Sequence, residues 1–244
     1  MNKAFIDHTF KALYEINGVI NRQQESLFEY HDIGAGGDQS SGFDLEAERI
    51  FLKYLHHFGV IDSEESGLMG RGESRIILDP IDGSDNIHSL FPYYGASIAL
   101  QRDNTTVAAV ICNFATKICF VRDGNYLYRT RLDDFTCKTE VVVHSHSKIG
   151  LFEKSQEHLD FAKILMNNGL KYRSPGAIAL SLSYAHYVDY VLFLGTIRNY
   201  DIEAGLFLCK DLHCFIDESI VLVSKQRDTF EKISALFANF KGSK

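Results

Sequence analysis

The strongest constraint on the fold of this chain is an apolar run that leads directly into two carboxylates. Residues 76–78 (Ile-Ile-Leu) have the composition of a short buried strand, and residues 79–86 read Asp-Pro-Ile-Asp-Gly-Ser-Asp-Asn. We expect Pro80 to end the strand, so that Asp79 and Asp82 project from its carboxyl end. Proteins that alternate helices and strands bind ligands at that edge of the sheet, so the pattern indicates a ligand site.

The side chains of this octapeptide suit a divalent metal ion held against a phosphate. Mg²⁺, Mn²⁺ and Ca²⁺ prefer carboxylate and carbonyl oxygens. Gly83 allows the backbone to approach an anion closely. A helix that starts near Ser84, with Ser84 as its cap, would add free N–H groups for the phosphate. The competing interpretation is an ordinary turn, because Pro, Asp and Gly are all turn residues.

Acids elsewhere in the chain favour the metal site over the turn. Glu64 and Glu65 follow another apolar run in residues 61–67 (Ile-Asp-Ser-Glu-Glu-Ser-Gly), and acids at two adjacent strand ends can reach one metal. Asp201 directly precedes residues 202–210, which have the pattern of an amphipathic helix. A helix cap is the alternative role for Asp201. For Glu65 we favour a solvated carboxylate or one that lies behind the ligands.

Taken in their order along the chain, the three segments around Glu64, Asp79 and Asp201 resemble the family of Mg²⁺-dependent, lithium-sensitive phosphatases that includes inositol monophosphatase and fructose-1,6-bisphosphatase. The resemblance is strongest over residues 37–100 and returns over residues 173–205. It implies an α/β fold of alternating helix and sheet layers, an αβαβα sandwich. It also implies an N-terminal α+β half (1–140) with most metal ligands and a C-terminal α/β half (141–244) that supplies Asp201 and substrate contacts, in one compact unit.

The chain carries signatures of both branches of this family. Ser84 followed by Asn86 is similar to fructose bisphosphatases, as is the Gly-Asp-Gln of residues 37–39 followed by Asp44. The Tyr-Asp pair that ends at Asp201 is similar to inositol monophosphatases instead. The reaction is therefore better defined by the sequence than the substrate.

The resemblance implies a ligand set for two metal ions. Glu64, Asp79 and the carbonyl of Ile81 hold the first ion. Asp79, Asp82 and Asp201 hold the second, so that Asp79 bridges the pair. Two-metal sites of this kind place the ions roughly 3.5–4 Å apart and clamp both oxygens of an in-line displacement. The ions are expected to be Mg²⁺, with Mn²⁺ as the substitute and Li⁺ as an inhibitor.

The same resemblance implies the catalytic and substrate-binding residues. Ser84, paired with Asp44, orients a metal-activated water and accepts its proton, and Glu64 takes part through its metal. No covalent phosphoenzyme is needed. A third, weakly held Mg²⁺ near Glu64 is a further expectation. The substrate is expected to contact Asp82, Gly83 and Ser84.

A second substrate-binding segment is expected at residues 173–177 (Arg-Ser-Pro-Gly-Ala), which resemble the strand-to-helix turn that lines the pocket. Gly176 and Ala177 are the expected backbone contacts. Where inositol monophosphatases carry a glutamate, residues 192–195 (Leu-Phe-Leu-Gly) contain no acid. Arg198 lies close by and is expected to bind a second phosphate or another anionic group. A surface arginine near a helix start is the alternative.

The composition limits the class of protein. With 244 residues and 45% hydrophobic content, the chain is long enough to bury a large core. Its N-terminus does not resemble a signal peptide, and no apolar run reaches the length of a membrane span. The five cysteines lack Cys-x-x-Cys spacing, which favours the cytoplasm over a disulfide framework. A formal charge of −7 provides no basic surface for nucleic acid.

Periodicity alone predicts a mixed α/β protein. We expect helices over residues 3–30, ended by the glycine-rich loop 34–37, and over residues 44–58. An antiparallel meander is expected over residues 94–129. Farther on, helices alternate with strands: helices over 157–168, 175–184, 202–210 and 228–240, strands over 188–193 and 220–224.

The leading functional hypothesis is a metal-dependent phosphomonoesterase of carbohydrate metabolism that acts on a small polyol or sugar phosphate. A same-family phosphatase for histidinol phosphate or 3′-phosphoadenosine 5′-phosphate is the first alternative. A non-catalytic, metal-binding regulatory relative is the second. The presence of six candidate metal-binding and catalytic residues argues against this second alternative. These residues are Asp44, Glu64, Asp79, Asp82, Ser84 and Asp201. Relatives of this kind are commonly homodimers or homotetramers.

Overall fold

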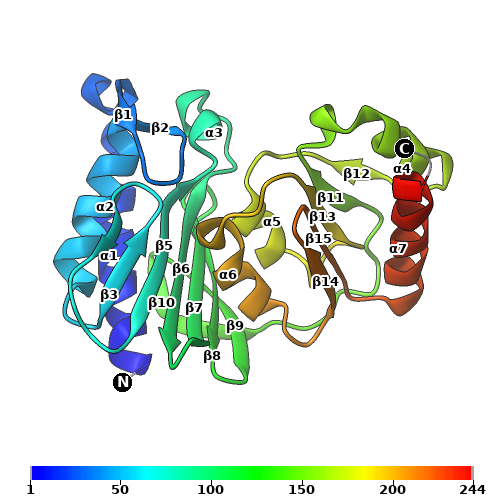
Figure 1. Cartoon of the computed structure of the whole chain (residues 1–244). Helices are drawn as coiled ribbons and strands as arrows, with labels where there is room; N and C mark the ends of the chain where they lie inside the picture. Colours follow the sequence, from blue (N-terminus) through cyan, green and yellow to red (C-terminus); the bar gives the residue numbers. More distant parts are fainter. Residues whose placement is uncertain (1, 243–244) are drawn as a thin grey trace.

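The computed structural model describes residues 2–242, which form a stack of alternating helix and sheet layers (Figure 1). From left to right in Figure 1, one helix pair covers a large sheet, a second pair lies between the two sheets, and a third pair covers the small sheet. The α/β sandwich expected from the sequence is confirmed. The pairs are α1 (Asn2–Arg22) with α2 (Gly42–Leu55), α5 (Ile178–Ser183) with α6 (Asn199–Leu208), and α4 (Leu159–Asn167) with α7 (Arg227–Gly242).

The first helix is shorter than the periodicity predicts. It ends at Arg22, because Gln23 adopts a left-handed conformation with φ of 46°. The expected continuation to residue 30 is therefore wrong. A capping box between Ser41 and Asp44 starts α2. Between the two helices lie η1 (Glu25–Phe28), β1 (Tyr30–Ile33) and β2 (Gln39–Ser41).

The large sheet has eight strands in the order β10-β9-β8-β7-β6-β5-β3-β4. Strands β6 to β9 form the expected antiparallel meander, and β10 extends it. The pair β3 and β5 is parallel, so their carboxyl ends lie side by side. The strands are β3 (Val60–Ser63), β4 (Gly67–Met69), β5 (Arg75–Asp82), β6 (Gly95–Arg102), β7 (Thr105–Asn113), β8 (Ile118–Asp123), β9 (Tyr126–Arg131) and β10 (Asp134–Glu140).

Strand β5 does not end at Pro80 as expected, but continues to Asp82. Its pairing with β6 shifts between Asp79, which faces Ser97, and Asp82, which faces Gly95. One extra residue on β5 forms a bulge there, a position that tolerates a proline without an N–H. Residues three apart in a regular strand point to opposite faces, whereas the bulge turns both carboxylates toward the same pocket.

The small sheet has five strands in the order β12-β11-β13-β15-β14. Strand β11 is parallel to both of its neighbours, β12 and β13. Its carboxyl end therefore opens beside that of β13, on the side that faces α6 and the large sheet. The strands are β11 (Gly150–Glu153), β12 (Tyr172–Arg173), β13 (Val191–Leu194), β14 (His213–Asp217) and β15 (Ile220–Ser224).

Central strands bury side chains on both faces. In β6, Ile98 packs in the core beneath α1 and α2, while Ala99 packs beneath α5 and α6. In β13, Leu192 faces α4 and α7, while Phe193 faces α5 and α6. Both sheets are therefore covered on both sides, which explains their nearly continuous apolar runs.

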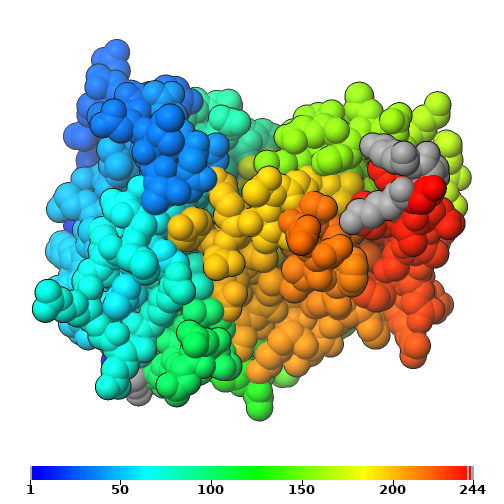
Figure 2. Space-filling model, in the orientation of Figure 1, coloured from blue at the N-terminus to red at the C-terminus, as the bar shows by residue number. Residues whose placement is uncertain are grey.

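The two sheets are joined by residues 141–149, and the division of the chain at residue 140 remains a prediction. In Figure 2 the blue and cyan N-terminal segments meet the gold segment that leads into α6. Among residues 2–242, no helix has the length and apolar character required to cross a membrane.

Candidate active site

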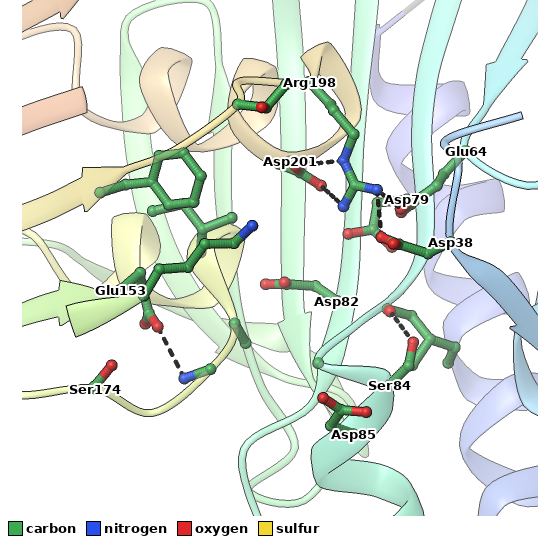
Figure 3. Close-up of a pocket in the computed structure, with 18 of the residues that line it drawn as sticks. Asp38, Glu64, Asp79, Asp82, Ser84, Asp85, Glu153, Ser174, Arg198 and Asp201 are labelled. Carbon is green, nitrogen blue, oxygen red and sulfur yellow. Dashed lines mark hydrogen bonds and ion pairs between the residues drawn. The ribbon is translucent and has the colours of Figure 1, made fainter. Parts of the chain in front are cut away.

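A pocket of about 540 Å³ opens where the carboxyl ends of β3 and β5 face the ends of β11 and β13 (Figure 3). All the predicted site residues line it except Asp44, which lies behind Ser84. Segments far apart in the sequence therefore meet here. The predicted residues that it brings together are Glu64, Asp79, Ile81, Asp82, Gly83, Ser84, Gly176, Ala177, Arg198 and Asp201.

Three carboxylates form a cluster on one side of the pocket. Glu64, Asp79 and Asp201 each offer an oxygen, and these oxygens lie within 4.8 Å of one another. Within residues 2–242, the Oδ1 atom of Asp79 is buried without a hydrogen-bond partner. A buried carboxylate oxygen normally has such a partner, so this atom is suited to a cation. The donor set consists of hard oxygens, and it fits Mg²⁺ or a similar divalent ion.

The remaining predicted ligands lie at the edge of this cluster. Asp82 accepts a hydrogen bond from the Leu180 amide at 2.8 Å through Oδ2. The Ile81 carbonyl lies 3.2 Å from the Ser84 hydroxyl oxygen, as the alternative acceptor to Asp44 for its single hydrogen. Figure 3 shows Asp82 directed toward the centre of the pocket. Both groups are positioned beside the cluster, and their role as ligands remains a prediction.

The pKa values of the clustered carboxylates are raised, so without a cation their ionised forms are disfavoured. Burial, together with the charges of Asp201 and Glu65, raises the pKa of Glu64 to about 8, although Arg198 opposes the shift. Burial, then the charges of Glu64 and Asp82, raises the pKa of Asp79. A divalent ion would relieve this repulsion, because opposite charge favours the ionised carboxylates.

Ser84 and Asp44 form a hydrogen-bonded pair at the pocket floor. The Ser84 hydroxyl donates to Asp44 Oδ1 at 3.1 Å. The other oxygen of Asp44 accepts from the Ser41 amide at 2.7 Å, which fixes the carboxylate. Burial raises the pKa of Asp44 despite these bonds. The short helix α3 (Ser84–His88) has Gly83 as its N-cap, with φ of 92°, so the expected capping role of Ser84 is wrong.

The turn at residues 174–177 is held from two sides by residues that the sequence analysis did not single out as site residues. Glu153 accepts hydrogen bonds from the Gly176 amide at 2.9 Å and from the Ser181 hydroxyl. Asn86 donates to the carbonyls of Tyr93 at 2.7 Å and Pro175 at 2.8 Å. Together they fix the backbone that faces the pocket.

A usable signal for Glu153 was present in the sequence. Like Glu64, it is an acid at the end of a short apolar run, here Gly-Leu-Phe of residues 150–152. The run is only a few residues long and lies outside the segments that resemble the family most. The contacts of Asn86 had no local signal, because its partners are up to 90 residues away.

Asp201 lies inside α6 rather than before it, because the helix begins at Asn199 and its N-cap is Arg198. The capping alternative for Asp201 is therefore wrong. Arg198 instead forms a forked pair with Asp201, and also contacts Glu64 at 2.9 Å and Asp38 at 2.6 Å. Its expected contact with a substrate anion remains a prediction.

Next to Glu64 lie Glu65 and the glycine-rich loop of residues 34–37. Glu65 accepts a hydrogen bond from the Ser40 hydroxyl, and burial raises its pKa to about 7. The amide of Gly36 donates to the Glu64 carbonyl at 2.6 Å. A Cβ at Gly36 would lie 2.6 Å from Glu64 Cγ, so the close docking of this loop requires glycine.

Comparison with known proteins identifies the family of this chain. The model of the inositol monophosphatase family matches residues 38–215. The fructose-1,6-bisphosphatase/inositol-1-monophosphatase of Methanocaldococcus jannaschii is 27% identical over 84% of this chain and 82% of its own length. The Nus factor SuhB of Xylella fastidiosa is 27% identical over 86% of this chain and 80% of its own. The fructose-1,6-bisphosphatase of Leishmania major has the same fold, with a TM-score of 0.78, 14% identity, and coverage of 96% of this chain and 94% of that chain.

The fold and the carboxylate pocket define a metal-dependent phosphatase class. Because the family model spans most of the chain, the protein belongs to the inositol monophosphatase family. The resemblance stated from the sequence is thereby confirmed, together with the enzyme class it implied, a phosphoric monoester hydrolase.

Proposed function

We propose that the protein hydrolyses a small polyol or sugar monophosphate, such as an inositol monophosphate. Fructose 1,6-bisphosphate is the second candidate substrate. The observation that carries the proposal is the unpartnered, buried oxygen of Asp79 within the cluster of Glu64 and Asp201, next to the Ser84 and Asp44 pair. A cluster of buried acids with raised pKa values beside a hydroxyl is typical of a catalytic site.

Glu64, Asp79, Asp201, Asp82 and the Ile81 carbonyl would hold the metal ions. Bound divalent ions lower the pKa of water and neutralise charge on the phosphate. We propose two or three Mg²⁺ ions, replaceable by Mn²⁺, with Li⁺ inhibiting the enzyme.

The chain's own groups carry the proton and orient the ester. Ser84 accepts the proton of the attacking water and passes its own to Asp44 along their 3.1 Å hydrogen bond. Burial raises the pKa of Asp44, which makes this carboxylate a better proton acceptor. The backbone at Gly83 approaches the phosphate, because a glycine with φ of 92° presents no side chain there.

The leaving group would lie between Asp82 and the turn of Gly176 and Ala177, where its alkoxide oxygen would take a proton from a water molecule in the pocket. Asp82 retains one oxygen for a hydroxyl, since the other is bound to Leu180. Arg198 is proposed to contact an anionic group of the substrate from the opposite wall. We further propose a cytoplasmic homodimer or homotetramer.

The test is release of inorganic phosphate by the purified protein with Mg²⁺. Inositol 1-phosphate and fructose 1,6-bisphosphate are the primary substrates, with histidinol phosphate and 3′-phosphoadenosine 5′-phosphate on the same panel. Activity that is lost in Asp79→Asn supports the proposal. Absence of release from every ester by a protein that binds Mg²⁺ would contradict it. That outcome would favour the regulatory alternative, which the similarity to a Nus factor also supports.

A further inference from the structure

Arg198 lies among the carboxylates that are proposed to hold metal. Its Nε and Nη2 atoms donate to the two oxygens of Asp201 at 2.9 and 3.2 Å. Its Nη1 atom lies 2.9 Å from Glu64 Oε1 and donates to Asp38 Oδ2 at 2.6 Å. Figure 3 shows the guanidinium between these three side chains. It therefore contacts two members of the carboxylate cluster at once.

The local backbone explains this placement. Arg198 is the N-cap of α6, in an extended conformation, and Asp201 follows three residues later in the first helical turn. That spacing places the two side chains on the same side of the helix. A forked arginine-carboxylate pair is geometrically demanding and holds both partners in one orientation. The guanidinium charge is consequently held within the cluster.

Arg198 also connects the cluster to the glycine-rich loop. Its Nη1 atom donates to the Gly36 carbonyl at 3.2 Å, in the loop that docks on Glu64. Its side chain is 29% exposed, whereas Asp38 is 80% exposed. The attraction between Arg198 and the buried carboxylates of Asp201 and Glu64 is therefore screened less by water than its attraction to Asp38. A guanidinium is not deprotonated in proteins, so Arg198 brings one positive charge to the cluster.

We propose that Arg198 is a resident counter-cation of the carboxylate cluster that competes with a divalent ion for Asp201 and Glu64. In the metal-free protein it neutralises part of the cluster. A metal ion at Asp201 has to displace the forked bonds and tolerate the nearby positive charge. The ion held by Asp201 is therefore expected to bind more weakly than the ion held by Glu64, because Asp201 carries two of the Arg198 bonds and Glu64 only one contact. This inference rests on the proposed metal site and concerns how that site is filled.

The test compares Arg198→Gln with the wild-type protein by titration calorimetry with Mg²⁺ and by electron paramagnetic resonance of bound Mn²⁺. We expect the weaker binding step to tighten about tenfold, since a neutral side chain no longer competes. Arg227→Gln, on the exposed surface of α7, is the matched control and leaves binding unchanged. Unchanged or weaker metal binding by Arg198→Gln would overturn the proposal.

Thermal unfolding provides a second, independent measurement. We expect Arg198→Gln to melt several degrees below wild type without metal, and the gap to close in saturating Mg²⁺. An equal loss in both conditions would show a purely structural role and contradict the proposal. If Arg198→Gln does not fold without metal, Arg198→Lys retains the charge without the forked bonds and should bind metal with intermediate affinity. Wild-type protein that binds no Mg²⁺ would instead reject the proposed metal site itself.

Discussion

The Glu153 carboxylate accepts a 2.9 Å hydrogen bond from the Gly176 amide and so ties the end of β11 to the turn that faces the substrate pocket. Strand pairing places Glu153 opposite Phe193 of β13. Residues 192–195, at the carboxyl end of β13, lack the acid that the inositol monophosphatase pattern would place there. An acid is nevertheless present, on the neighbouring strand.

The first prediction concerns Glu153. In Glu153→Gln, one carboxylate oxygen becomes an NH₂ group, which leaves a single acceptor oxygen for the amides of Gly176 and Ala177, so the turn is held less firmly. We expect KM for a polyol phosphate to rise about tenfold, with a smaller change in kcat. Steady-state kinetics measure this, with Glu218→Gln in the exposed β14–β15 turn as the control. An unchanged KM would show that Glu153 does not position the substrate.

The second prediction concerns Asn86, which joins α3 to the same turn. Asn86→Ala leaves the carbonyls of Tyr93 and Pro175 without this donor. We expect a loss of roughly 1–3 kcal/mol in the free energy of unfolding. Urea denaturation measures it, and Asn125→Ala, which removes only an exposed hydrogen bond with Lys210, should change stability by less than about 0.5 kcal/mol. Equal effects of the two variants would contradict the proposed link.

The third prediction concerns the Ser84 and Asp44 pair. Ser84→Ala and Asp44→Asn should each lower kcat by about 10²–10⁴, the usual range for a lost proton acceptor. The double variant should be little slower than either single variant, because the two residues act as one unit. Mg²⁺ affinity should change little in Ser84→Ala. Multiplicative losses in the double variant would show that the residues act separately.

The fourth prediction concerns metal removal and Asp79. Wild-type protein should gain thermal stability when Mg²⁺ is added, because an ion that binds only the folded state stabilises it. Asp79→Asn should show no such gain. Without metal, the variant should be at least as stable as wild type, since it removes a buried charge that is opposed by its neighbours. Differential scanning calorimetry with and without EDTA distinguishes these outcomes.

The fifth prediction is a pH effect away from the pocket. Burial, and next the charge of Arg122, lowers the pKa of His186 to about 4. The unfolded chain then binds more protons than the folded chain between pH 6.5 and 4, so acidification through this window destabilises the protein. Between pH 7.5 and 5, His186 should account for about 2 kcal/mol of lost stability. His186→Gln should reduce the pH slope of the unfolding free energy; an unchanged slope would assign it to other groups.

The sequence by itself determined the layered α/β class and the chemistry of the site. Apolar runs followed by acids mark Glu64, Asp79 and Asp82 because strand ends and carboxylate chemistry are local properties of a sequence. Motif spacing brought Ser84, Asp44 and Asp201 into the same hypothesis through the family resemblance. The predictions that were wrong also concerned short segments: the last residue of the first helix and the last residue of strand β5.

Only the tertiary structure decided how these residues meet. The bulge in β5 turns Asp79 and Asp82 into one pocket, and strand order brings Glu153 to the turn of Gly176. Arg198 is the N-cap of α6, which begins at Asn199 rather than at residue 202, and it contacts Asp201, Glu64 and Asp38. Its expected contact with a substrate anion stays a prediction. Register, bulges and contacts across many residues depend on the packing of the whole chain, and short sequence patterns do not encode them individually.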